Sequence, residues 1–486
     1  MKHFRLILTA VAVAVFSGAL LPSCSEGEAP APAGALTLAP SETGAPYLVI
    51  VGETLGIPYT AEQVGTLTCS AAEGWTVELD ETARLVKLSA SLDTNAEPSI
   101  TLTLSGVDMS GKTLTSSVEV HLLDFSDPKG AFVLNEGNMT TENGSLTYIS
   151  PWGDVVPDAY RLANGTELGN VCQDLYIHDG LVYILSQNGG KNTVGSEFEN
   201  DGMLVVADAR TLKRVKAFSS EELSALSWPT HLAVLDAKHV YIRTDSDNGG
   251  ATQQGIWRLD TTSGALSFVE KTAGAPKNRM AVVGGKVYST NGSYMVNILQ
   301  ISADSDIAEK IALPFSSQIL HVNDSEEFAG GIRPSDDGGL WIMGQGTGRY
   351  WIHKYDLSAR AGREMALAAE PRKVYNCPFA VDGNVIYYVS GTYVHRFDFD
   401  AASTAEADLQ LFDVYDFDAL AGNTLYNGPG FHPVTGDLYV ASMGDFTNYA
   451  TDNVVWVVSP AAPTQPVAQY RGYAHFPAGI YFPAEF

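Results

Sequence analysis

The chain has 486 residues, only 17% of them charged, and a formal net charge of −27 at pH 7. So acidic a surface argues against nucleic acid as a partner, and the length exceeds that of one ordinary domain. The 46 glycines and 22 tyrosines agree with an extracytoplasmic β-protein. We therefore expect two folded units, both built from strands.

The first residues predict export and lipid anchoring. A basic start and an apolar stretch at 6–21 precede Cys24, which indicates a bacterial signal peptide over 1–23. The segment resembles the lipobox of bacterial lipoproteins, which implies lipidation of Cys24 and a stable membrane anchor. A secretory peptide cut elsewhere and an uncleaved anchor helix are the alternatives.

An Ala/Pro-rich tether over 24–35 follows the cysteine and would hold the folded part off the membrane. Its acidic start at 25–28 resembles the signal that sends Bacteroidota lipoproteins to the outer face of the outer membrane. The expected location is therefore the outer membrane, lipid-anchored and facing the cell exterior.

Residues 36–126 alternate apolar and polar side chains with the period of strands. The runs that carry this pattern are 47–51, 66–69, 75–79, 85–88, 100–104 and 118–122. This pattern predicts a small immunoglobulin-like β-sandwich, with Trp75 in its core, that acts as a spacer.

Within this unit, 106–113 matches the phosphate-loop pattern letter for letter. A phosphate loop needs a helix after Thr113, whose N-terminal amides face the phosphates. The sequence at 113–120 is strand-like instead, so we expect a hairpin turn.

Residues 130–486 repeat a two-strand pattern at intervals of roughly fifty residues, the period of a propeller blade. A glycine-containing turn precedes most copies of the second strand. The aromatic residues at the centres of the second strands are Tyr183, Tyr241, Tyr288, Trp341, Tyr387 and Tyr439. A seventh copy is split between 476–482 and 131–134, which would close the ring and remove the open sheet edge.

The predicted fold is therefore all-β, an immunoglobulin-like β-sandwich followed by a seven-bladed β-propeller. A large two-sheet sandwich is the alternative. Within the propeller, 221–226 and 360–370 could each form a short helix. Three further cysteines, Cys69, Cys172 and Cys377, lack metal-type spacing, and we expect free thiols because a bridge between the last two would cross the ring.

Candidate ligand-binding residues come from the loops on one face. In a four-stranded blade, the connection into the first strand and the connection out of the second share a face, and loops on a rigid scaffold tend to carry function. Aromatic, amide and arginine side chains there suit a flat ligand with polar edges. The candidates are Asn135, Glu136, Gln173, Gln187, Trp228, His231, Arg243, Asp245, Arg279, Asn291, Arg349, Tyr375, Asn376, Tyr426, Asn427, Asp445, Phe446 and His475.

Signals for catalysis are weak. Asp245 begins a calcium-like acidic run without the downstream glutamate of an EF-hand, the histidines have no metal-binding spacing, and no nucleophile elbow occurs. We expect a binding protein with no catalytic residues, cofactor or resident metal. One alternative is a propeller hydrolase or lyase that holds a divalent cation through Glu136, Asp245 and Asp445; another is a scaffold of an outer-membrane complex.

Four segments, 132–138, 144–148, 174–177 and 476–480, carry a family resemblance. They resemble the YncE-like seven-bladed β-propeller lipoproteins of Bacteroidota, over about 130–486. Relatives with this architecture include surface lipoproteins that capture cobalamin and pass it to a TonB-dependent outer-membrane transporter, and other members sit beside transporters of unknown cargo. The resemblance implies capture of a small nutrient, with a corrinoid as the leading ligand and a TonB-dependent transporter as partner. The residues that would suit a corrinoid are Trp228, Tyr375, Tyr426, Phe446, Asn427 and Arg279.

Overall fold

The computed structural model describes residues 33–93, 95–189, 199–244, 253–273, 275, 277–291, 297–315, 330–346, 349–374 and 376–486. The predicted signal peptide, Cys24 and most of the predicted tether lie outside them, as do Asp245 and Tyr375. The described chain is nearly all strand. No helix in it has the length and apolar character needed to cross a bilayer.

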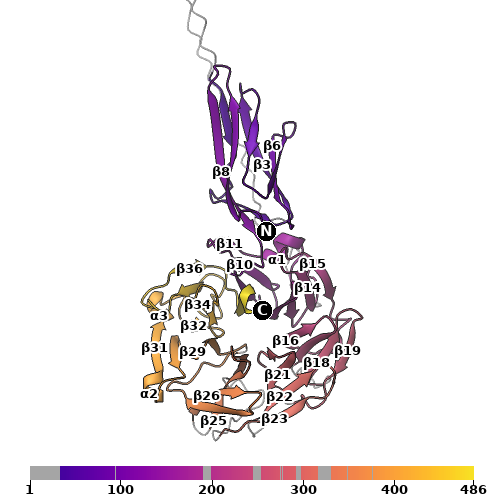
Figure 1. The fold of residues 1–486 in the computed structure, drawn as a ribbon, viewed down its shortest axis with the longest axis vertical. Helices are drawn as coiled ribbons and strands as arrows, with labels where there is room; N and C mark the ends of the chain where they lie inside the picture. Colours follow the sequence, from indigo (N-terminus) through magenta and orange to yellow (C-terminus); the bar gives the residue numbers. More distant parts are fainter. Residues whose placement is uncertain are drawn as a thin grey trace, which may run out of the picture.

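The N-terminal strands form two four-stranded sheets, drawn in indigo in Figure 1. One sheet has the order β1 (Ala35–Leu38), β3 (Thr54–Glu62), β6 (Leu85–Ala90), β5 (Trp75–Asp80); the other has the order β2 (Tyr47–Ile50), β8 (Thr113–Leu123), β7 (Ser99–Val107), β4 (Thr68–Ser70). Alternate residues, such as Ile57, Val86 and Leu102, meet in a shared core. Trp75 packs against that core but is only partly buried, and its indole N–H donates to the Glu97 carbonyl at 2.9 Å.

The segment that matches a phosphate loop is a hairpin, as predicted. Strands β7 and β8 pair antiparallel up to the Val107–Thr113 pair. Asp108 accepts hydrogen bonds from the backbone of Ser110 and Lys112 at 2.9 and 3.0 Å, which shapes the turn. Strand β8, not a helix, begins at Thr113. This segment therefore lacks the helix N-terminal amides that bind phosphate in a phosphate loop.

The rest of the described chain forms seven sheets, six of four strands and one of five, arranged in succession around a ring (Figure 1). The innermost strands are β37 (Pro477–Tyr481), β12 (Cys172–His178), β16 (Pro229–Asp236), β20 (Ala281–Val283), β24 (Gly331–Pro334), β28 (Phe379–Asp382), and β32 (Thr424–Leu425) with β33 (Gly430–Phe431). The second strands are β9 (Ala131–Asn135), β13 (Leu181–Ser186), β17 (His239–Thr244), β21 (Lys286–Thr290), β25 (Leu340–Gly346), β29 (Val385–Ser390) and β34 (Leu438–Met443). All six predicted aromatic residues lie in these second strands.

The outer half of each sheet follows the same order. The third strands are β10 (Ser145–Ile149), β14 (Leu204–Asp208), β18 (Gly255–Asp260), β22 (Asn297–Ser302), β26 (Arg349–Asp356), β30 (Tyr393–Asp398) and β35 (Asn453–Val458). The outermost strands are β11 (Val155–Val156), β15 (Arg214–Phe218), β19 (Ala265–Phe268), β23 (Glu309–Ala312), β27 (Ala361–Ala366), β31 (Asp408–Asp413) and β36 (Ala468–Arg471). Short helices are α1 (Ala159–Asn164), α2 (Thr404–Ala407), α3 (Val414–Phe417) and the 3-10 turn η1 (Pro483–Glu485).

The split repeat closes the ring. Strand β37 pairs antiparallel with β9, and Ile480 lies opposite Val133 and Tyr481 opposite Phe132. The innermost strand of this sheet thus comes from the C-terminal residues and the next strand from residue 131 onward, as predicted. The pairing leaves β9 with a partner on both sides, so no sheet edge is open there.

Two expectations for short helices were wrong. Residues 361–366 form β27, which pairs with β26 along its whole length, and residues 221–225 form turns. β27 is an outermost strand with exposed residues at its start, and its charged and alanine-rich composition resembles that of a surface helix. The described cysteines Cys69, Cys172 and Cys377 are free, and the last two are buried.

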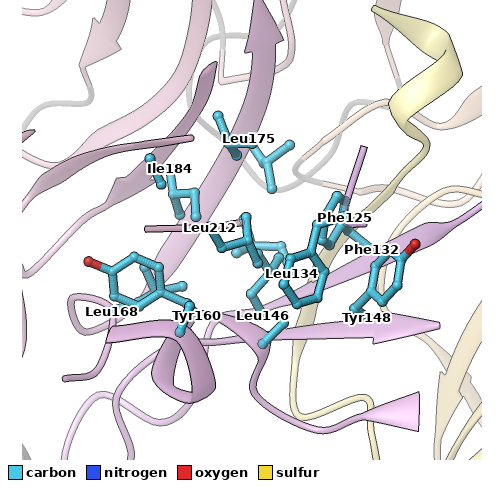
Figure 2. Packing of buried hydrophobic residues seen from close by; sticks show 14 of the residues in the cluster. Phe125, Phe132, Leu134, Leu146, Tyr148, Tyr160, Leu168, Leu175, Ile184 and Leu212 are labelled. Carbon is cyan, nitrogen blue, oxygen red and sulfur yellow. The ribbon is translucent and has the colours of Figure 1, made fainter. Parts of the chain in front are cut away.

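One hydrophobic cluster joins the N-terminal sheets to the ring (Figure 2). Phe125, between β8 and β9, is fully buried and packs edge-on against Tyr148, with 4.9 Å between ring centroids. Polar contacts surround the cluster: Arg210 binds Asp124 through two nitrogens at 2.8 and 2.9 Å, and His121 lies 2.6 Å from Asp154. The two parts are therefore held by a packed joint.

Candidate ligand-binding site

The strand register places the candidate residues on one face of the ring. In each sheet the start of the innermost strand lies beside the end of the second: Cys172 pairs with Ser186, and Pro229 with Thr244. In the closing sheet the Glu136 N–H donates to the Phe476 carbonyl at 2.9 Å. We call this surface, where the chain enters the innermost strands and leaves the second strands, the front face.

Four aromatic rings gather on the front face beside the closing sheet. Phe476 lies at their centre, with ring centroids 5.5 Å from Tyr426, 5.9 Å from Phe446 and 4.3 Å from Tyr449. Phe446 is roughly parallel to Phe476, and 65% of its surface is exposed. We call these four residues the aromatic platform. Its exposed ring can stack on a flat apolar surface.

Glu136 lies beneath the platform. The Tyr426 hydroxyl donates to its Oε2 at 3.2 Å, and Gln173 also forms a hydrogen bond with the carboxyl group. Burial raises the pKa of Glu136 to about 7, although Lys277 and these two hydrogen bonds act in the opposite direction. The group therefore changes charge near neutral pH and can either donate or accept a hydrogen bond there.

The sequence analysis missed two members of this site, Glu142 and Tyr449. Glu142 lies 2.6 Å from the His475 ring and accepts a hydrogen bond from the Tyr449 hydroxyl at 3.3 Å. Tyr449 follows Asp445 in the loop after β34, where the Asp445 carboxylate accepts from two backbone amides at 2.7 Å. The Asp445 carboxylate therefore stabilises its own turn, and we do not assign it to ligand contact. Tyr449 lies close to Phe446 in the sequence, and this proximity was the signal from which its place in the site could have been predicted.

Many of the predicted amides are buried and serve the scaffold. The Nδ2 groups of Asn376 and Asn427 both donate to the Ala478 carbonyl, at 2.9 and 3.0 Å. Asn135 donates to Thr147 at 3.2 Å, and Asn291 pairs with Asn297. The first two contacts tie neighbouring sheets to the innermost strand β37, and the other two lie within single sheets.

The remaining candidates divide by exposure. Gln187, His231 and Arg243 are buried, and the Arg243 guanidinium donates to the Ala275 carbonyl at 3.0 and 3.2 Å. Burial, with the nearby cations Lys277, Arg243 and Arg279, holds the pKa of His231 well below its usual value, so this imidazole is neutral. Trp228 is 36% exposed and Arg349 is exposed.

Below the front face, a buried ion pair joins several sheets of the ring. Asp174 is fully buried, lies 3.4 Å from Arg279 Nε, and accepts from the Tyr481 hydroxyl at 2.9 Å and the Leu232 amide at 3.0 Å. The Arg279 guanidinium lies 4.8 Å from the centre of the Tyr481 ring. Asp174, Leu232 and Tyr481 lie in three different sheets, and Arg279 precedes β20 of a fourth, so these contacts link four sheets.

Across the described ranges, no three His, Cys, Asp or Glu side chains are grouped so that they could hold a metal ion. Glu136 and Asp445, which the cation hypothesis joins, have different surroundings: Glu136 contacts Tyr426, whereas Asp445 binds its own loop. Asp245, the third member, lies outside the described residues.

A ring of successive four-stranded sheets, closed by pairing between the two ends of the repeat region, defines a β-propeller-like protein. A family model described as "Domain of unknown function (DUF5074)" matches residues 129–484, and the chain belongs to this family.

Solved structures with a similar fold include a quinonprotein alcohol dehydrogenase-like protein from Bacteroides thetaiotaomicron VPI-5482. It is 16% identical, with a TM-score of 0.54, over 92% of this chain and 99% of that chain. Weaker likenesses are an auxiliary nutrient binding protein from the same organism (10% identity, TM-score 0.37, 83% and 94% coverage) and virginiamycin B lyase from Staphylococcus aureus (10%, 0.36, 78% and 97%). No curated protein sequence matches the chain.

Proposed function

We propose that this protein captures a small nutrient ligand on the front face of its ring. In this proposal the ring is a seven-bladed, YncE-like β-propeller over 130–486, and residues 36–126 form an immunoglobulin-like spacer. Cys24 carries the lipid that anchors the chain in the outer membrane, facing the exterior. The seven sheets and the pairing of β37 with β9 support the blade count.

The observation that carries the proposal is the aromatic platform. An exposed ring such as Phe446, supported from behind by Phe476, offers a rigid stacking surface that needs little ordering when a ligand binds. Gln173 and Glu136 supply hydrogen-bonding groups beside it. A flat macrocycle with amide edges, as in a corrinoid, matches this pairing of chemistries, and delivery to a TonB-dependent transporter would follow capture.

The test is titration of cobalamin into the soluble chain from residue 25 onward, followed by tryptophan fluorescence and calorimetry. We expect Phe446→Ala to weaken binding about tenfold, equivalent to about 1.4 kcal/mol. The control is Val215→Ala, which removes an exposed apolar side chain from the outermost strand β15. Unchanged affinity in both Phe446→Ala and Gln173→Ala, or no binding by the wild-type chain, would contradict the proposal.

A second candidate function is catalysis, and the pKa of Glu136 is the observation that favours it. A carboxyl group that titrates at about 7 suits general acid or base work. A hydrolase or lyase of this kind would lose turnover in Glu136→Gln at unchanged folding stability. We give binding precedence because Cys172, a thiol whose pKa the charge of Glu136 affects, is fully buried, and burial raises its pKa to about 12, so it is a poor nucleophile.

A further inference from the structure

A cavity of about 510 Å³ opens on the opposite surface of the ring, which we call the back face. Its walls include the first two residues of β20, residues 332–334 of β24, residues 380–382 of β28 and the C-terminal residues 484–486. Among the candidates from the sequence, Arg279 alone lines it. None of the four platform residues lines it, so this chamber is separate from the aromatic platform.

Arg333 provides the positive group of the chamber. Its Nε donates to the Phe379 carbonyl at 2.7 Å, which fixes the plane of the guanidinium. Its NH1 lies 3.8 Å from Glu485 Oε1, too far for a hydrogen bond. The side chain is 18% exposed. The ion pair with Glu485 leaves the terminal N–H groups without a direct hydrogen bond, so a ligand carboxylate that displaces Glu485 can bind them through two parallel hydrogen bonds.

The negative groups lie at the rim. Asp336 and Asp382 line the chamber, are exposed, and form no ion pair with any described residue. Asp336 follows Arg333 by three residues on a chain that runs toward the back face, so it can lie up to about 10 Å nearer the opening. Charge in the chamber is therefore layered, positive inside and negative at the mouth.

Aromatic side chains complete the lining. Tyr176 packs edge-on against Phe486, with 4.8 Å between ring centroids, and Phe431 borders the same space. Glu485, beside Phe486, presents its carboxylate to Arg333. The C-terminal residues thus place a carboxylate and an aromatic ring in the chamber, which shows that its walls accept this chemistry.

We propose that the back-face chamber binds a di- or tripeptide, with its carboxylate on Arg333 and its ammonium group at Asp336 and Asp382. A peptide of two or three residues, at about 3.3–3.6 Å each, has a length comparable with the upper limit of about 10 Å between the charged layers. The volume lies within the range of small-ligand sites. The apolar side chain of the peptide would lie against Tyr176 and Phe431.

The test is calorimetry with alanyl-alanyl-phenylalanine, its N-acetylated form and its C-terminal amide. We expect the free peptide to bind and each capped form to bind at least tenfold more weakly. Arg333→Met should abolish binding, and Asp336→Asn with Asp382→Asn should weaken the free peptide while leaving the N-acetylated form unchanged. The two aspartates are exposed, so this double variant tests the site even where Arg333→Met fails to fold.

Two control variants on the front face, Phe446→Ala and Arg349→Met, should leave peptide binding unchanged. Loss of peptide binding with intact cobalamin binding in Arg333→Met would separate this proposal from the front-face function. Three results would overturn the peptide-binding proposal: equal affinity for the free peptide and its two capped forms, full affinity in the folded Arg333→Met variant, or no heat from any of the peptides.

Discussion

The Asp174–Arg279 pair gives the sharpest stability prediction. Asp174→Asn keeps an acceptor oxygen for Tyr481 and Leu232 but leaves the Arg279 guanidinium buried without its counter-ion. Breaking a buried pair by removing one partner costs about 3–5 kcal/mol. At about 2 °C per kcal/mol in a domain of this size, the melting temperature of the ring should fall by roughly 6–10 °C. Scanning calorimetry measures this, and Asp445→Asn, a change at an exposed turn, should leave it unchanged.

The double variant tests the cause. Burial raises the pKa of the Asp174 carboxyl, with Arg279 and the donated hydrogen bonds acting in the opposite direction, so ionisation there is disfavoured overall. Replacing both charges should therefore cost less than replacing one. Asp174→Asn with Arg279→Met should recover at least about 1 kcal/mol relative to Asp174→Asn alone. Additive losses, or a single variant as stable as the wild type, would refute the reasoning.

Four further predictions concern other residues. Burial lowers the pKa of His121, but its hydrogen bonds to Asp154 and Glu119 outweigh burial and raise that pKa overall. The contribution of His121 to stability is therefore present below the ordinary pKa of histidine and is lost as pH rises through the raised value. Calorimetry of His121→Phe should show that this pH dependence is gone. Glu136 has a pKa of about 7, so its contribution to the free energy of unfolding is likewise lost as pH rises through 7. In Glu136→Gln the free energy of unfolding should no longer change over this pH range, and a pH dependence equal to that of the wild type would contradict the prediction. Phe125→Ala should cost about 3–5 kcal/mol and let the N-terminal sheets unfold separately, seen as a new transition. Burial raises the pKa of Cys172 to about 12, so native protein should resist alkylation there, and rapid labelling found by mass spectrometry would disprove it.

Regular features of the ring could be predicted because each is local. An aromatic residue centred in a second strand recurs in every explicit repeat, with a glycine turn before it in most of them, and the structure places Tyr183 and Tyr439 accordingly. The split repeat was also predictable, since its two halves complete one another. The helix predicted within 360–370 was wrong, and the reason limits prediction for all outermost strands. Such a strand has little buried surface, so its composition resembles that of a strand only weakly.

The candidate sites were harder to predict because they depend on contacts between distant segments. The front-face position of Glu136 and Phe446 follows from blade geometry, but the pairing of Glu142 with His475 joins residues 333 positions apart. An amide at a strand start can face a ligand or a neighbouring carbonyl, and the sequence does not distinguish Asn376, which binds Ala478, from Gln173. The charged groups of the back-face chamber come together only because β20, β24 and β28 lie side by side in the ring. The sequence of a single repeat does not predict this arrangement.

The closing pair of strands also constrains how the protein reaches its native state. Tyr481 and Asp174 are 307 positions apart, so the bond between them forms only after nearly the whole chain has left the ribosome. Until β37 docks, β9 exposes an unpaired backbone edge that can recruit other chains. Contacts of such long range also slow folding. A chaperone that covers residues 131–135 would protect this edge until β37 pairs with β9, and truncations before residue 477 should accumulate as aggregates.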